Sequence, residues 1–129
     1  MQQTISLNEF ANAVINVGSD VSVIAQGEPG IGKSSMLKVI RDKLPTHETR
    51  YIDCALLDLG DLQMPKVTDS VDFVPNKMFV SDSGKPLVVM LDEIGKAMRP
   101  VQNALLTLLL EKRIGNHHLP EGSIVFGTT

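Results

Sequence analysis

The chain has 129 residues, of which 43% are hydrophobic and 21% charged, a composition typical of one globular domain and unlike that of a disordered chain. Twelve Lys and Arg against fifteen Asp and Glu give a formal net charge of −3, and this acidic balance disfavours a nucleic acid as the main partner. The single cysteine, Cys54, argues against a disulfide framework and predicts a reducing, cytoplasmic location. The first ten residues do not resemble a signal peptide, and no apolar run is long enough to span a membrane.

The first part of the chain predicts a helix, a strand and a second helix. Apolar residues recur at helical spacing from Leu7 to Val17 and predict a short amphipathic helix. Val21–Ala25 is an apolar run that precedes a glycine-rich turn, so we expect a buried strand there. Helical spacing returns from Gly32 to Leu44, and Pro45 ends this second helix.

The middle of the chain predicts two further strands separated by an insertion. Arg50–Leu57 is an apolar strand candidate, in which Cys54 would be a small core residue. Residues 60–85 mix Pro, Asp, Ser and Gly with short β-like pieces at 71–74 and 78–80, which indicates a loop or hairpin insertion. Leu87–Leu91 is the most apolar strand candidate of the chain.

The last part predicts a helix, a tight turn and a strand. Pro100 stands where a helix would begin, and the leucines that follow cover more than one helix face, so we expect this helix to be buried on two sides: Leu105, Leu106 and Leu108–Leu110. Residues 113–120 contain a possible turn at Gly115, and Ser123–Phe126 is the final strand candidate. Alternating strands and helices predict a parallel α/β sheet with right-handed crossovers.

The segment GEPGIGKS, from Gly27 to Ser34, matches the phosphate-loop pattern G-x-x-x-x-G-K-[ST]. Glycines let backbone N–H groups turn toward a phosphate, and the following helix adds the positive end of its dipole. Lys33 would reach the β- and γ-phosphates and Ser34 would bind Mg²⁺. The alternative is a chance glycine turn before a helix. The predicted nucleotide-binding residues are Gly27, Glu28, Pro29, Gly30, Ile31, Gly32, Lys33, Ser34 and Ser35.

Two acids follow the most apolar strand, at the edge where open α/β sheets bind ligands. We expect Asp92 to hold Mg²⁺, directly or through water. Glu93 would orient and deprotonate the attacking water, which favours hydrolysis over a simple switch. The alternative is a strand that ends in two solvated acids, and the upstream phosphate loop weakens that alternative.

Three other residues have weaker functional interpretations. His117 and His118 are adjacent, so on a strand they would point in opposite directions and could not share a metal ion. We interpret them as exposed hairpin residues. Arg99 could act across a subunit interface, but a solvated helix start is the simpler interpretation.

The motifs together resemble AAA+ ATPases of the MoxR type, which are related to the dynein-like AAA group. The resemblance rests on GEPGIGKS, VVMLDEIGKA, RPVQNALLTLLLEKRIG and LPEGSIVFGTT, and it extends from about Ser6 to Thr129. It implies a P-loop NTPase fold, a three-layer α/β sandwich with a parallel sheet of order 5-1-4-3-2. Ser123–Phe126 would then lie between the strand before Gly27 and the strand before Asp92. It also implies hairpins at residues 66–80 and 113–120.

The resemblance further implies function and assembly. The chain would bind ATP or ADP and hydrolyse ATP with Mg²⁺, using Lys33 and Glu93 as catalytic residues and Ser34 and Asp92 as metal ligands. Members form rings, usually hexamers, and remodel or activate partner proteins, often ones with von Willebrand factor A domains. Residues 1–129 would be a partial AAA+ core that ends before the fifth strand, the sensor Asn, the arginine finger and the helical lid.

The sequence departs from the family pattern after the acidic pair. Members commonly have Asn-Arg after Asp-Glu-Ile, whereas Gly95 and Lys96 follow here.

Two alternative functions stay open from the sequence. One is a nucleotide-binding switch or fragment without appreciable turnover, and the other is a helicase-loader type of AAA+ protein.

Overall fold

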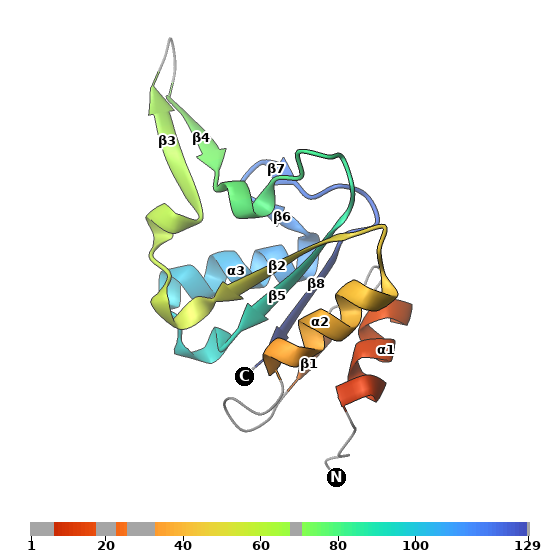
Figure 1. Ribbon diagram of the computed structural model, residues 1–129. Helices are drawn as coiled ribbons and strands as arrows, with labels where there is room; N and C mark the ends of the chain where they lie inside the picture. The colour runs from red at the N-terminus through yellow and green to blue at the C-terminus, as the bar shows by residue number, and fades with distance from the viewer. Residues whose placement is uncertain (1–6, 18–22, 26–32, 68–70, 129) are drawn as a thin grey trace.

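The computed structural model describes residues 7–17, 23–25, 33–67 and 71–128. Four parallel strands form its central sheet: β1 (Val23–Ala25), β2 (Glu48–Asp53), β5 (Leu87–Asp92) and β8 (Ile124–Thr128). Their order is β1-β8-β5-β2 (Figure 1). This order confirms that the last strand lies between the first strand and the strand that carries the acidic pair.

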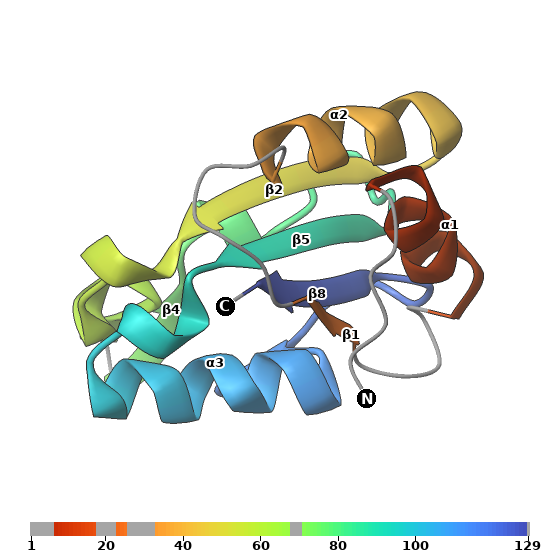
Figure 2. The ribbon, with the colours of Figure 1, turned by 90° about the horizontal axis from the view of Figure 1, so that it is seen from below.

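Helices cover both faces of the sheet and produce the predicted three layers. Figure 2 shows α1 (Leu7–Val17) and α2 (Lys33–Lys43) on one side and α3 (Arg99–Glu111) on the other. Because successive side chains of a strand point to opposite faces, β5 contributes to two cores. Val88 and Met90 pack with α1 and α2, whereas Leu87, Val89 and Leu91 pack with α3.

Two antiparallel hairpins lie outside the sheet. β3 (Gln63–Val67) pairs with β4 (Val71–Pro75), and this hairpin projects from the body of the molecule (Figure 1). β6 (Arg113–Ile114) pairs with β7 (His117–His118), and Gly115 in the turn between them has a φ of 55°, a conformation that glycine adopts without strain. Both hairpins were predicted, although the first spans residues 63–75 instead of 66–80.

Two predicted strand segments are short 3-10 helices. β2 ends at Asp53 because the Asp53 side chain accepts a hydrogen bond from Ala55 N and caps η1 (Cys54–Leu56). Cys54 is therefore a buried core residue, as predicted, but it does not belong to a strand. In the same way Asn76 caps η3 (Lys77–Phe79), so the segment 78–80 is not a strand.

The prediction that α3 is buried on two sides is wrong. Leu105, Leu108 and Leu109 are buried against the sheet, but Leu106 is 40% exposed and Leu110 is 69% exposed. The apolar run is simply wider than the face that the sheet covers. Within the residues that the structure describes, none of the helices has the length and hydropathy needed to cross a bilayer.

Candidate functional site

The carboxyl ends of the four parallel strands meet at one edge of the sheet. Ala25 lies opposite Thr128 in the β1–β8 pair, and Asp53 lies opposite Asp92 in the β2–β5 pair. The Thr128 hydroxyl donates a 2.5 Å hydrogen bond to Asp92 Oδ1 and so joins these two pairs into one row. The sheet order thus brings residues from distant parts of the sequence to the edge where ligands of such sheets bind.

Asp92 is bonded by hydroxyl groups from both neighbouring strands. Thr128 of β8 bonds Oδ1, and the Tyr51 hydroxyl of β2 donates a 2.5 Å hydrogen bond to Oδ2. Short O–H···O⁻ bonds of this kind are charge-assisted and stronger than bonds between neutral groups. They fix the plane of the carboxylate, and both donors are uncharged, so these two bonds orient the acid without neutralising it.

Strand periodicity places Asp92 on the face of the sheet that α2 covers. Tyr51 lies opposite Met90, and Met90 packs against α1 and α2. Because side chains two residues apart share a face, Asp92 is on that same side. Lys33 is the first residue of α2, and the connection from β1 to α2 leaves the sheet at Ala25, next to Thr128.

The predicted phosphate loop is only partly described. Residues 27–32, which hold Gly27, Glu28, Pro29, Gly30, Ile31 and Gly32, lie outside the described residues. The backbone of Lys33 and Ser34 forms the start of α2, as predicted, and Ser35 is exposed in its first turn. The structure therefore gives the position of the helix that would follow the loop, and the binding roles of these residues stay predictions.

Glu93 has an unusual backbone conformation. Its φ of 57° and ψ of 50° lie in the left-handed region, which is costly for residues other than glycine by about 1–3 kcal/mol. The backbone N–H of Glu93 donates to Thr128 Oγ1 at 3.2 Å, so one threonine hydroxyl bonds both members of the acidic pair. Strained residues of this kind cluster at functional sites, which makes Glu93 a candidate on structural grounds as well.

The segment after Glu93 is held by packing and by a side chain of α3. Ile94 is buried against Gly127, and a Cβ at Gly127 would overlap the Ile94 side chain. Gln102 Nε2 donates to the carbonyl oxygens of Gly95 at 3.1 Å and Ala97 at 2.9 Å. These contacts fix the turn that carries Glu93 relative to the sheet.

Lys96 lies close to the Glu93 carboxylate. The distance from Lys96 Nζ to Glu93 Oε2 is 3.8 Å, and the Lys96 side chain is 61% exposed. An ion pair at this separation with one exposed partner contributes little to stability. Lys96 is one of the two residues that depart from the family pattern, and the structure gives it this contact with the candidate base.

The environment of the acids also changes two neighbouring groups. The hydrogen bond to Asp92, together with partial burial, raises the pKa of Tyr51 to about 12. Burial, followed by the charges of Asp53 and Asp92, raises the pKa of the Cys54 thiol to about 12. Cys54 is therefore a protonated, unreactive thiol at neutral pH, in agreement with its predicted core role.

The donor set at this edge suits a hard divalent cation. Mg²⁺ prefers oxygen ligands and commonly uses only one or two protein carboxylates together with phosphates and water. Asp92 supplies such an oriented carboxylate, and Asp53 lies opposite it in the neighbouring strand. No cluster of three His, Cys, Asp or Glu side chains able to hold a metal ion occurs in the described parts of the chain, so the protein residues seen here do not form a closed metal cage.

The remaining candidates lie away from the acidic pair. His118 is exposed, as predicted, but His117 is only partly exposed, because its Nε2 lies 3.0 Å from the carbonyl oxygen of Phe79 and this hydrogen bond joins β7 to η3. Arg99 is exposed at the start of α3. The hydroxyls of Tyr51 and Thr128 and the amide of Gln102 were not predicted as site residues. In the sequence they are ordinary polar residues: Tyr51 lies within a predicted strand, Gln102 within a predicted helix, and Thr128 just after the last predicted strand.

Comparisons with known proteins identify the family and the fold of the chain. Residues 22–122 match the family described as AAA domain (dynein-related subfamily). No curated protein matches the chain closely enough in sequence to serve as a relative. Several solved structures share its fold, and the three described next match it with identities between 16% and 21%.

Hsp104, solved in a closed state with ATPγS and FITC casein, has a TM-score of 0.61 and 21% identity over 88% of this chain. A mutant of RuvB from Thermotoga maritima has a TM-score of 0.58 and 16% identity over 95%. An MCM homologue from Methanopyrus kandleri has a TM-score of 0.55 and 19% identity over 92%. The chain spans only 22%, 38% and 26% of these three proteins, respectively.

Proposed function

The chain belongs to the dynein-related subfamily of AAA domains, and from this premise we propose that it binds ATP at the carboxyl edge of its sheet and hydrolyses it with Mg²⁺. The observation that carries the proposal is that β5 ends in Asp92, on the sheet face covered by α2, and that Glu93 follows it directly. The Thr128 hydroxyl bonds both residues: it donates to the Asp92 carboxylate and accepts from the backbone N–H of Glu93.

The proposed roles follow from the position of each residue. Residues 27–35 bind the phosphates through backbone N–H groups and the amino end of α2. Lys33 contacts the β- and γ-phosphates, while Ser34 and Asp92 hold Mg²⁺. The metal ion, when bound, neutralises charge that develops on the phosphates. The polar edge of the sheet leaves Asp92 oriented for this role before any ligand arrives.

Glu93 is the proposed general base. A base must lie within hydrogen-bond reach of the water that it deprotonates, so its backbone has to be held firmly. The bond from Glu93 N to Thr128 and the packing of Ile94 on Gly127 supply that support. The contact with Lys96 puts a positive charge 3.8 Å from the Glu93 carboxylate.

We also propose a subtype, an assembly and a partner for the protein. The order of motifs supports a MoxR-type AAA+ protein whose residues 1–129 form part of the ATPase core. Such a protein would act in the cytoplasm as a ring, with six subunits as the expected number. It would remodel or activate a partner protein, for which a von Willebrand factor A domain is the first candidate to test.

Nucleotide binding by the Lys33→Ala variant tests the phosphate site. A charge-assisted hydrogen bond contributes about 1.5–3 kcal/mol, so losing Lys33 should weaken ATP binding by about tenfold or more. Lys38→Ala is the matched control, because Lys38 is an exposed lysine of the same helix. Binding can be measured by isothermal titration calorimetry with ATP and Mg²⁺.

The outcomes separate the candidate functions. Equal affinity of wild type and Lys33→Ala would overturn the phosphate-site assignment. Tight binding with no phosphate release under any assembly condition would instead favour a nucleotide-binding switch. Salt-sensitive binding to single-stranded DNA would favour the helicase-loader function.

A further inference from the structure

Tyr51 makes a hydrogen bond that its exposure to solvent does not require. Its side chain is 48% exposed, yet its hydroxyl donates to Asp92 Oδ2 at 2.5 Å, across 41 positions of sequence. An exposed phenol hydroxyl can bond water freely. This one is instead directed at the acid that we propose as a metal ligand.

The register of the sheet explains how this contact arises. Tyr51 lies opposite Met90, and Asp92 is two residues further along β5 on the same face. Diagonal neighbours across a strand pair are within reach of a long aromatic side chain. A tyrosine at this position of β2 can therefore reach Asp92, whereas a shorter hydroxyl residue could not.

The two hydroxyls act on different oxygens of Asp92. Thr128 fixes Oδ1 and Tyr51 fixes Oδ2, so rotation of the carboxylate would break at least one of the two bonds. An ionised carboxylate has about four acceptor positions, so two hydroxyl donors orient it and leave acceptor capacity for other partners. Groups that orient a metal ligand from outside the coordination sphere commonly change metal affinity by about 10–100-fold when removed.

We propose that Tyr51 is a positioning residue, whose hydroxyl holds the Asp92 carboxylate in the orientation that binds Mg²⁺ together with the nucleotide. This inference rests on the proposed function of Asp92. In this role Tyr51 would act through Asp92, to which its hydroxyl is bonded, and not as a ligand of the metal ion. The bond from Tyr51 restricts the Asp92 side chain before the cation binds. Less conformational entropy is then lost on binding, so the affinity for the cation is higher.

The Tyr51→Phe variant tests the proposal, because it keeps the ring and removes only the hydroxyl. The affinity of the full chain for the non-hydrolysable analogue adenylyl imidodiphosphate is measured with Mg²⁺ and again with EDTA. We expect Tyr51→Phe to lower the affinity by about tenfold with Mg²⁺ and to leave the affinity in EDTA unchanged. A merely structural role would change both affinities alike.

Thr49→Val is the matched control. Thr49 lies two residues earlier on the same face of β2, and its hydroxyl accepts a 3.0 Å hydrogen bond from Arg41 Nε, away from Asp92. This variant should show the wild-type ratio of affinities with and without Mg²⁺. A change in that ratio as large as the one in Tyr51→Phe would overturn the proposal.

The single tyrosine also provides a direct optical measurement, because the chain has one Tyr and no Trp. A phenol bonded to a carboxylate loses its proton to it in the excited state, which quenches emission. Asp92→Asn should therefore raise the tyrosine emission of the folded protein. Unchanged emission would show that the bond is absent in solution and would overturn the proposal.

Asp92→Asn also separates the metal role of Asp92 from the positioning role of Tyr51. If Mg²⁺ does not improve nucleotide binding in the wild type, or improves it equally in Asp92→Asn, the metal role of Asp92 fails and the role of Tyr51 fails with it. If Asp92→Asn loses the Mg²⁺ effect and Tyr51→Phe retains it in full, the metal role of Asp92 stands and only the positioning role of Tyr51 is wrong.

Discussion

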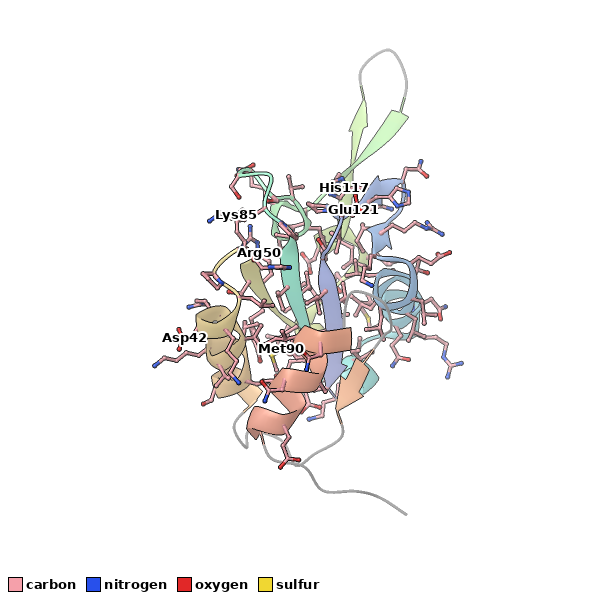
Figure 3. The ribbon with its side chains drawn as sticks, turned by 90° about the vertical axis from the view of Figure 1, so that its right-hand side faces the viewer. Asp42, Arg50, Lys85, Met90, His117 and Glu121 are labelled. Atoms are coloured by element: carbon pink, nitrogen blue, oxygen red, sulfur yellow. The ribbon has the colours of Figure 1, made fainter. Side chains whose placement is uncertain are left out.

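The strand pair β2–β5 has an acidic side chain at each end, and the hydrogen-bond donors to these two acids differ in charge. At the amino end, Glu48 accepts a 2.7 Å hydrogen bond from Ser83 and a 2.9 Å bond from the cationic Arg50. At the carboxyl end, uncharged hydroxyls of Tyr51 and Thr128 bond Asp92. Figure 3 shows Arg50 and Lys85 together toward the amino end.

The surroundings of the two ends differ in the same way. At the amino end, side chains join the segments that precede the strands. His47 Nε2 forms a hydrogen bond with the Gly122 carbonyl oxygen, and Ser123 Oγ accepts a hydrogen bond from Leu87 N. At the carboxyl end, Glu93 has a strained backbone. A cation paired with an acid reduces the charge of the pair, whereas a bond from a neutral hydroxyl orients the acid. The charged pair at the amino end joins a strand to the loop that holds Ser83, and the hydroxyl bonds at the carboxyl end join three strands at the proposed site.

The largest expected effect is at the carboxyl end. Glu93→Gln should lower the rate of ATP hydrolysis by about 10²–10⁴-fold, because the amide cannot accept the proton of the attacking water. Nucleotide affinity should stay near that of the wild type. Phosphate release and equilibrium binding measure the two quantities.

Glu111→Gln is the control for this change, since Glu111 is an exposed acid at the end of α3 that pairs with Arg113. It should hydrolyse ATP at the wild-type rate. Undiminished turnover in Glu93→Gln would remove Glu93 as the general base.

The amino end should respond in stability instead. Leu87 is fully buried at the start of β5, so Leu87→Ala should lower the free energy of unfolding by about 2–5 kcal/mol through lost burial and a residual cavity. Urea unfolding measures this loss. The affinity of the folded protein for nucleotide should not change.

Leu110→Ala provides the comparison, because Leu110 is 69% exposed. Its effect on the free energy of unfolding should stay within about 0.5 kcal/mol. An equal loss in both variants would mean that the Leu87 side chain is not in the core that we describe.

Thr128→Val should affect both properties. The change keeps the shape of a fully buried side chain but removes the oxygen that accepts from Glu93 N and donates to Asp92. An unsatisfied N–H should lower the free energy of unfolding by about 1–3 kcal/mol. Urea unfolding with and without Mg²⁺ and nucleotide would show an additional loss of ligand stabilisation, and Thr128→Ser should restore both. Failure of Thr128→Ser to do so would assign the effect to packing.

The smallest effect is a pH dependence at the amino end. The hydrogen bond from Ser83, followed by that from Arg50, lowers the pKa of Glu48 from its ordinary value of 4.5. The unfolded chain therefore binds this proton more readily, so the contribution of Glu48 is present above pH 4.5 and is lost as the pH falls through the lowered pKa.

Glu48→Gln should flatten this part of the stability profile. The urea midpoint of the wild type should fall more than that of the variant between about pH 5 and about pH 3. Parallel profiles would show that Glu48 does not contribute. Because water reaches the carboxyl group and screens its charge, the difference should be small.

The sequence by itself determined the elements whose physical signals are local. Helical spacing marked α1, α2 and α3, and continuous apolar runs marked β5 and β8, because periodicity depends only on near neighbours. The positions of Asp92 at the end of β5 and of Lys33 at the start of α2 followed from these elements. The strand order came from a resemblance between whole motifs, which the sheet confirms.

Local capping was harder to predict. The side chains of Asp53 and Asn76 end or replace strands by bonding nearby backbone groups, and this competition depends on geometry that composition does not encode. The exposed Leu106 and Leu110 show a related limit. An apolar run indicates which residues favour burial, but only the area of the covering sheet decides how many are buried.

Tertiary structure alone decided which residues surround the acidic pair. Tyr51, Asp92 and Thr128 belong to three strands separated by at least 36 positions of sequence, and the register of the sheet brings them together. The left-handed backbone of Glu93 is likewise held by contacts from β8 and packing on Gly127. A sequence motif specifies the chemical groups of the candidate site, whereas pairing between distant strands determines how those groups are oriented.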